Sequence, residues 1–75
     1  MQVDVQLMQR FDPELMMQRL FFPLNWLDDR AVLVLVQDPH DLYIDETLTE
    51  KLPTAEIVKV LGTEDDITRL IDHYY

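Results

Sequence analysis

The sequence contains no cysteine, no serine and only one glycine, Gly62. Without cysteine the chain can form neither a disulfide framework nor a thiolate metal site. Without serine a Ser-His-Asp triad is impossible, and one glycine is too few for a Gly-rich phosphate loop. These absences exclude several of the arrangements by which hydrolases and nucleotide-binding enzymes are recognised.

Basic residues are also scarce: six Lys and Arg stand against 15 Asp and Glu, which gives a formal net charge of −9. A nucleic-acid-binding protein needs a basic face to displace the counterions of the phosphates, and anionic lipid attracts basic segments. The longest apolar run falls far short of the roughly 20 residues that span a bilayer. Near the N-terminus, Asp4 interrupts any signal-like apolar region. We therefore expect a soluble, cytoplasmic domain that neither binds nucleic acid nor inserts directly into a membrane.

Apolar residues are plentiful, at 48% of 75 residues, which is too rich for a disordered chain. A domain of this size buries only about 60% of its unfolded surface. One sheet with two or three helices is therefore about all that the chain can build.

The pattern predicts an α+β fold in the order helix, strand, strand, helix, strand, helix, with a β-hairpin in a small three-stranded sheet. Ala31–Val36 is apolar at six successive positions, so it predicts a central strand or one covered on its main face. Pro23 predicts an edge strand because proline cannot donate to a ladder. Residues 1–11 are expected to be loosely ordered or weakly helical, and residues 12–75 to form one domain. The predicted elements are helix 13–20, strand 21–27, strand 31–37, helix 39–51, strand 55–61 and helix 64–74.

Three helix starts are marked by capping residues. Asp12 precedes Pro13, and Asp38 precedes Pro39 with Asp41 three positions after the cap. Such side chains accept hydrogen bonds from free N–H groups of the first turn, where proline loses no useful donor. A capping box of the acidic kind is predicted at the last helix. The predicted structural caps are Asp12, Asp38, Asp41, Thr63 and Asp66.

Neither the histidines nor the acidic groups form a recognisable metal or catalytic motif. His40 and His73 belong to no ligand pattern. The acidic groups at 28–29, 45–46 and 64–66 lack the alternating oxygen ligands around a glycine that a calcium loop requires. Thr63 has no suitable base beside it, which favours a capping role. We therefore predict no catalytic residue, no metal and no cofactor.

Methionine and aromatic residues gather in one part of the sequence and allow two interpretations. Ordinary core filling is favoured, but such side chains also suit adaptable partner surfaces. The set is large for 75 residues to bury alone, so a partner-binding surface with some exposed members is the second interpretation. The residues are Met16, Met17, Phe21, Phe22 and Trp26.

The order and spacing of these sequence features resemble those of the N-terminal domain of type II secretion and type IV pilus assembly ATPases. This domain is the general secretory pathway protein E N-terminal domain family. The resemblance covers about residues 12–75. It lies in Pro13 to Leu20, Phe22-Pro23-Leu24, Val32 to Val36, Asp38-Pro39-His40-Asp41-Leu42, Ala55 to Leu61 and Glu64 to Tyr75.

This resemblance implies a non-catalytic module that tethers a bacterial secretion or pilus motor to the cytoplasmic domain of an inner-membrane platform protein. The other implied partner is the remainder of the parent ATPase, whose phosphate loop and zinc-binding cysteines are absent here. The implied location is cytoplasmic, peripheral to the inner membrane through a protein partner. A free-standing enzyme finds no support in any constellation of residues.

Two alternatives remain open. In some pilus relatives an adjoining, related segment binds cyclic di-GMP through repeated Arg-Leu-Gly and Pro-Leu-Gly elements. The same domain type also occurs fused to other bacterial envelope proteins. Here Pro23-Leu24 is followed by Asn25, and no Arg-Leu-Gly is present. A bis-phosphate ligand is bound by clustered arginines and backbone N–H donors, whereas the arginines of this chain are scattered along the sequence. Tethering is therefore favoured over cyclic-dinucleotide sensing.

Overall fold

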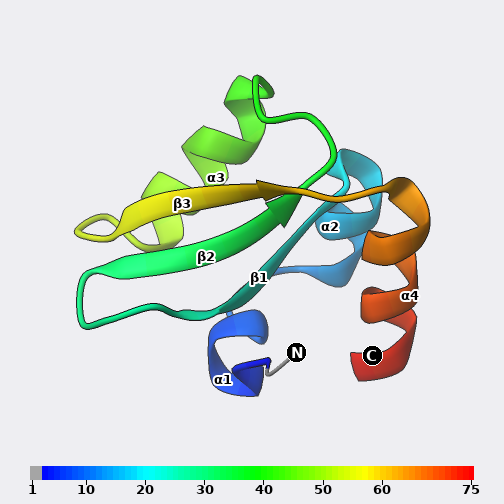
Figure 1. The fold of residues 1–75 in the computed structure, drawn as a ribbon, viewed down its shortest axis with the longest axis horizontal. Coiled ribbons are helices and arrows are strands. Elements are labelled where there is room, and N and C mark those ends of the chain that lie inside the picture. Colours follow the sequence, from blue (N-terminus) through cyan, green and yellow to red (C-terminus); the bar gives the residue numbers. More distant parts are fainter. Residues whose placement is uncertain (1–2) are drawn as a thin grey trace.

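The computed structural model describes residues 3–75, and Figure 1 shows their arrangement. The predicted α+β class is confirmed, and so is the order of elements from residue 13 onward; a short helix, α1, precedes them. The elements are α1 (Val5–Met8), α2 (Pro13–Arg19), β1 (Phe21–Trp26), β2 (Ala31–Val36), α3 (Leu42–Lys51), β3 (Glu56–Leu61) and α4 (Glu64–Tyr74).

The described strands form one mixed sheet in the order β1-β2-β3. β2 is central, as its apolar run predicts; it pairs antiparallel with β1 and parallel with β3. Pro23 lies on the edge strand β1, also as predicted. The register shifts between Pro23 and Asn25, which leaves Leu24 as an extra residue in a bulge.

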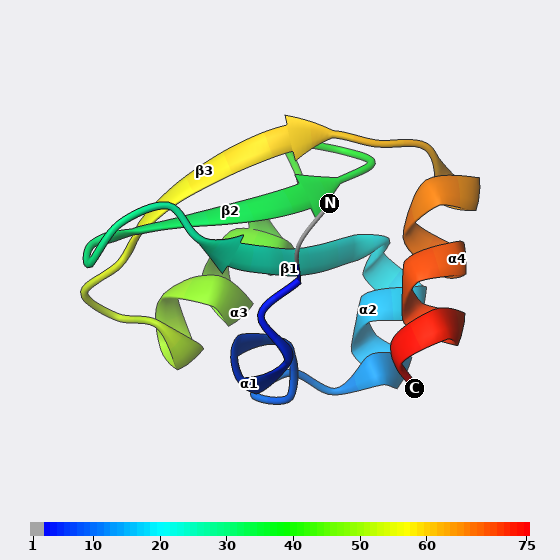
Figure 2. The ribbon, with the colours of Figure 1, turned by 60° about the horizontal axis from the view of Figure 1, so that its bottom comes forward.

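The two faces of the sheet carry different helices. Lys59 pairs with Val34, and its Nζ donates to the carbonyl of Pro39 at 2.8 Å and forms an ion pair with Asp45 of α3. This contact places α3 over one face. Phe22 of β1 points to the opposite face, where its ring centroid lies 6.1 Å from that of Tyr74 in α4. Figure 2 shows α3 beneath β2 and β3, with α4 beside the end of the sheet.

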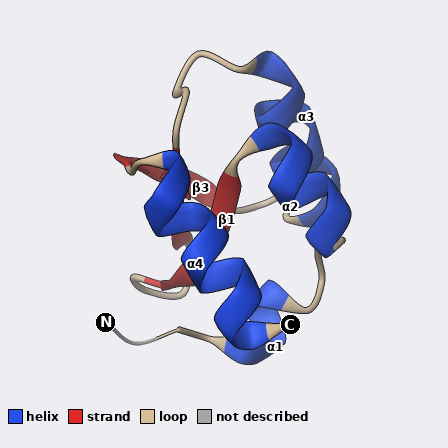
Figure 3. Ribbon diagram, turned by 90° about the vertical axis from the view of Figure 1, so that its right-hand side faces the viewer, coloured by secondary structure: helices blue, strands red, loops and turns tan. Residues whose placement is uncertain are grey.

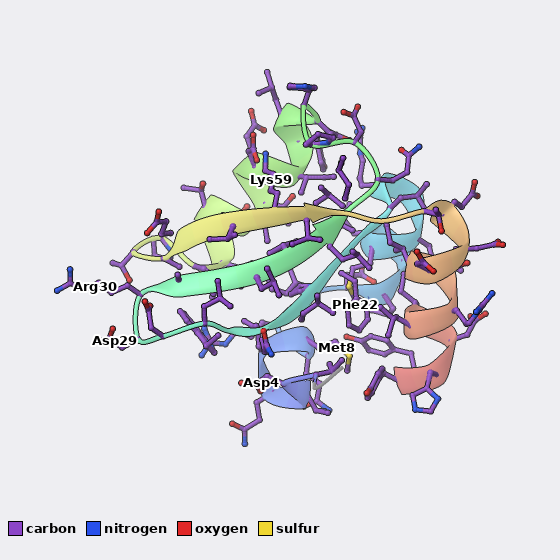
Figure 4. All side chains as sticks on the ribbon, in the orientation of Figure 1. Asp4, Met8, Phe22, Asp29, Arg30 and Lys59 are labelled. Atoms are coloured by element: carbon purple, nitrogen blue, oxygen red, sulfur yellow. The ribbon has the colours of Figure 1, made fainter. Side chains whose placement is uncertain are left out.

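Residues 3–11 are packed more tightly than the sequence predicts. Leu7, Met8 and Phe11 are at most 3% exposed and belong to the core. The Asp4 N–H donates to the carbonyl of Leu24 at 2.7 Å, at the outer edge of β1. Figure 4 shows Met8 near Phe22, between the sheet and the C-terminal helix. Residues 1–2 of the predicted loose segment lie outside the described part of the chain.

The C-terminal residue fastens this segment to α4. The Tyr75 hydroxyl donates to the carbonyl of Met8 at 3.0 Å and lies 3.2 Å from the carbonyl of Phe11. Partial burial, with a smaller contribution from the charge of Asp12, raises the pKa of Tyr75 above its ordinary value of 10.0. Figure 3 shows the end of α4 beside α1. The two ends of the described chain are therefore joined through side-chain contacts.

The helix caps follow the predicted chemistry with one correction. Asp12 accepts from the Glu14 N–H at 2.9 Å, and Thr63 and Asp66 form a reciprocal capping box. The N-cap of α3, however, is Asp41, which accepts from the Tyr43 N–H at 2.9 Å. The prediction that Asp38 caps this helix was wrong. The Asp38 carboxylate accepts from the His40 N–H within a separate turn. The helix therefore begins only at Leu42.

The two aspartates should therefore differ in their effect on stability. Asp41→Ala is expected to lower the free energy of unfolding by about 1 kcal/mol, because a first-turn N–H of α3 loses its acceptor. The ion pair of Asp41 with Arg19, at 3.7 Å, adds little because Arg19 is exposed. Asp38→Ala should cost less, since the helix keeps its cap. Urea denaturation of both variants tests this order, and equal losses would contradict the assignment.

The hairpin turn between β1 and β2 provides a pH-dependent contribution. The Asp28 carboxylate accepts from the Arg30 N–H at 2.7 Å and the Ala31 N–H at 2.8 Å. These two bonds, that to Arg30 first, hold the pKa of Asp28 below its ordinary value of 3.8. The stability that they contribute is present above that value and is lost as the pH falls through the lower, folded-state pKa.

Asp28→Asn is accordingly expected to flatten the fall of the thermal midpoint as the pH is lowered below about 4. The neighbouring variant Asp29→Asn is the control, because Asp29 is an exposed carboxylate of the same turn. Thermal unfolding followed by circular dichroism at a series of pH values measures both. The same acid sensitivity in the Asp28 variant and the parent chain would rule out this role.

Candidate functional site: a groove between the sheet and α4

A groove with a volume of about 630 Å³ lies between the end of the sheet and α4. Small-molecule and cofactor sites commonly have volumes in this range. Its apolar lining comes from β2, β3 and α4. These residues are Leu35, Val60, Leu61, Leu70 and Tyr74.

The local sequence explains why the groove forms here. β3 ends in Val60 and Leu61, and the Gly62 N–H continues the ladder by donating to the Val36 carbonyl at 2.8 Å. The absence of a side chain at Gly62 leaves room for Leu35, since an added Cβ would lie 2.6 Å from its Cδ1. Thr63 then caps α4, so the helix starts directly beside the strand that it follows.

Three polar side chains from α4 also line the groove: Asp66, Arg69 and His73. Their spacing of three and four residues places them along one side of the helix. The His73 ring packs edge-on against Tyr74 at 4.7 Å between centroids, and Tyr74 in turn packs against Phe22 of the core. One wall of the groove is therefore packed against the core through Tyr74.

The groove combines apolar contact area with a few polar side chains. Its polar groups are one acid, one arginine, one histidine and the hydroxyl of Tyr74. Within residues 3–75, no group of three or more His, Cys, Asp or Glu is arranged to hold a metal ion. Exposed apolar side chains at its border, Val60 at 41% and Leu61 at 68%, are typical of a contact surface.

Most of the partner-binding cluster predicted from sequence lies in the core. Met16, Phe21 and Phe22 are each 0% exposed, so a surface role for these three was wrong. Phe21 and Phe22 point to opposite faces of β1, and both faces are covered: Phe21 packs edge-on against Phe11 at 6.0 Å, and Phe22 packs against α4. The N-terminal segment, which the sequence predicts to be loosely ordered, covers Phe21 through Phe11.

The other two members of the cluster are exposed but do not form one surface. Met17, at 41% exposure, lies on α2 in a hollow shared with Ile71 of α4. Trp26, at 36%, lies at the opposite end of β1 beside the exposed Leu27. The length of β1 separates them.

A second, more acidic hollow lies on α3. Its volume is about 480 Å³, and its lining combines Leu42, which is 72% exposed, with acidic and hydroxyl side chains. The remaining lining residues are Asp45, Glu46, Thr49 and Glu50. All belong to one helix, so this hollow is a helix surface rather than a cleft between elements.

Sequence reasoning missed the groove residues on β3 and α4. A signal was present, because four of the five residues from Ile57 to Leu61 are apolar and they fall on both faces of a predicted strand. A chain with few helices cannot cover both faces of every strand, so some of these side chains had to remain exposed. The position of α4 determines which of these side chains remain exposed.

These features define a small α+β domain with an apolar groove at one end of its sheet. The family model of the MshEN domain matches residues 1–75, and the chain belongs to this family. The resemblance to the N-terminal region of type II secretion and type IV pilus assembly ATPases is thereby confirmed. Among residues 3–75, the structure has no helix with the length and apolar character needed to cross a bilayer.

A solved structure, "Structure of MshE with cdg", has the same fold. It superposes with a TM-score of 0.82 over 100% of this chain, at 20% sequence identity. The chain covers 53% of that MshE chain, so it spans about half of its length. At this identity the likeness establishes the fold. Comparison with curated protein sequences gives no significant match.

Proposed function

We propose that the chain is a non-catalytic interaction domain of a bacterial secretion or pilus assembly ATPase, and that it tethers this motor to the cytoplasmic domain of an inner-membrane platform protein. The observation that carries the proposal is the apolar groove between the sheet and α4, with Leu61 exposed at its border. Apolar side chains next to a pocket act as anchors in protein interfaces.

Two further observations support this function. Membership of the MshEN family connects the domain with pilus and secretion motors. The formal charge of −9 disfavours nucleic acid and anionic lipid as partners, and an acidic surface raises the association rate with a basic protein. The domain would then stay on the cytoplasmic side and reach the inner membrane through its partner.

Leu61→Asp is expected to weaken binding to the cytoplasmic domain of the platform protein by at least about tenfold, since a charge would be buried in the interface. The fold should survive, because the side chain is 68% exposed. Leu42→Asp is the matched control: its side chain is 72% exposed but lies on α3, outside the groove. Isothermal calorimetry with the purified platform domain measures both affinities.

The two variants separate the possible outcomes. Loss of binding in the Leu42 variant alone would move the interface to the acidic surface of α3. Unchanged binding in both variants, or no binding by the parent chain, would refute the proposed docking role of the groove.

Cyclic-dinucleotide sensing is the second candidate, favoured by one feature of the groove. Arg69 and His73 lie on the same side of α4 above an apolar floor, and arginine is well suited to pair with phosphate. Asp66 beside them and the net negative charge oppose an anionic ligand. Calorimetry with cyclic di-GMP decides: micromolar affinity that is lost in Arg69→Ala would support sensing, whereas no measurable binding would favour tethering.

A further inference from the structure

The outer edge of β3 has backbone groups that no other described strand pairs with. β3 is an edge strand in the order β1-β2-β3. The Glu56 N–H donates to the Arg30 carbonyl at 2.7 Å, and the Gly62 N–H donates to Val36. Because alternate residues of a strand turn their backbone groups to opposite edges, every second residue from Glu56 faces β2. The residues that turn their N–H and C=O groups to the outer edge are Ile57, Lys59 and Leu61.

The opposite edge of the sheet, by contrast, is closed. The N–H of Asp4 bonds to the carbonyl of Leu24, and Pro23 offers no N–H at all. The bulge at Leu24 further disturbs the outer side of β1. Figure 1 shows α1 beside β1, whereas no described strand lies beyond β3. Free edges are usually blunted in this way, so an unblunted one is a specific feature of β3.

Lys59 is the residue that would ordinarily protect such an edge, since a lysine on an edge strand discourages pairing with another chain. Here its Nζ is held by the carbonyl of Pro39 and by Asp45, over the face that carries α3 (Figure 4). Its side chain is only 24% exposed. The charge is thus paired within the chain, which weakens its protection of the outer edge.

We propose that the partner binds by adding an extended segment to β3 as a fourth strand. This inference rests on the proposed function and specifies how the same site would hold its partner. Main-chain hydrogen bonds to the outer residues of β3 would supply affinity. Alternate side chains of the added segment would lie over Val58 and Val60 and extend toward the groove, which would supply specificity.

Charge indicates the chemistry of the added segment. Glu56 lies at the start of β3, and Glu64, Asp65 and Asp66 follow its end. The complementary segment is apolar at alternate positions and carries Lys or Arg near its ends. A second copy of this chain fits less well, because each copy has a charge of −9. A symmetric antiparallel pair centred on Lys59 would also place two lysines opposite each other, which is destabilising.

Amide hydrogen exchange tests strand addition directly. The ¹⁵N-labelled chain is measured by NMR alone and with the unlabelled cytoplasmic domain of the platform protein. The amides of residues 57, 59 and 61 should exchange freely in the isolated chain and slow by at least about tenfold in the complex, because they gain hydrogen bonds. The amides of residues 56, 58 and 60 already face β2, so they serve as internal controls within the same strand.

A pair of variants at one position provides an independent measurement. Leu61→Pro removes an outward N–H as well as the side chain, whereas Leu61→Ala removes the side chain but keeps the N–H. Proline is tolerated at edge positions whose N–H faces solvent. The proline variant should bind at least about fivefold more weakly than the alanine variant. If the proline variant does not fold, the exchange pattern of the parent chain still decides.

The outcomes distinguish this inference from the function on which it rests. Binding with new protection alternating along β3 supports strand addition. Binding that leaves residues 57, 59 and 61 exchanging at their free rates overturns strand addition while preserving the interaction role. Absence of binding overturns both. The same protection appearing on concentration of the chain alone would identify a second copy as the occupant and overturn the choice of partner.

Discussion

Phe22→Ala is expected to lower the free energy of unfolding by about 3–5 kcal/mol, the largest effect of any substitution considered for this chain. Phe22 is 0% exposed, and its ring packs against Tyr74 of α4. Removing it leaves a cavity between β1 and α4. Small domains are stable by only about 5–15 kcal/mol, and this chain is at the small end, so the variant should be partly or wholly unfolded at room temperature.

Met17→Ala is the matched control because both residues belong to the cluster in which sequence alone could not separate core from surface. Its side chain is 41% exposed, so the loss should stay below about 1 kcal/mol. Urea denaturation followed by circular dichroism compares the two variants. A well-folded Phe22 variant that has lost only partner binding would show that Phe22 is a contact residue rather than a core residue.

The features predicted correctly from sequence depend on neighbours within a few residues. Six apolar residues in succession require cover on both faces, which is why β2 could be placed at the centre of the sheet. Pro23 restricts its strand to an edge regardless of the rest of the fold. The Thr63 and Asp66 pair begins α4 through bonds within its own first turn.

The features that sequence did not predict depend on distant contacts or on competition between equal signals. α1 is a single turn that would not persist alone; it is held by the Asp4 bond to Leu24 and by Tyr75, 67 residues beyond Met8. Asp38 and Asp41 are equally good helix caps. The choice of Asp41 follows from the turn that Asp38 makes with His40.

The candidate site lies at the limit of what local patterns can show. Composition identified aromatic and methionine side chains as candidates for a partner-binding surface. It could not tell which of them would be buried in the fold. The exposure of Val60 and Leu61 is set by the placement of α4 and by the pairing of β3 with β2 alone. Strand order is a non-local property, so the free edge became evident only from the fold.

Gly62→Ala is expected to lower the free energy of unfolding by about 1–3 kcal/mol through overpacking. Backbone strain is not the reason, because Gly62 does not have a positive φ. The added Cβ would lie 2.6 Å from Cδ1 and 2.7 Å from Cγ of Leu35, both too close for contact. Leu35 is only 6% exposed and belongs to the core cluster, so a shift that relieves the clash would disturb its packing. Chemical denaturation of the variant gives the loss.

A double-mutant cycle shows whether Leu35 is the cause. Leu35→Ala alone should cost about 2–5 kcal/mol, as for other buried leucines. Because it also removes the atoms that the new Cβ meets, the double variant should lose at least about 1 kcal/mol less than the sum of the single losses. Leu33, a neighbour on the same face of β2, provides the control pair, for which additive losses are expected. Additive losses in both pairs would show that Gly62 is needed for a reason other than its contact with Leu35.

Since Leu35 also lines the groove, the same clash should weaken partner binding wherever the variant remains folded.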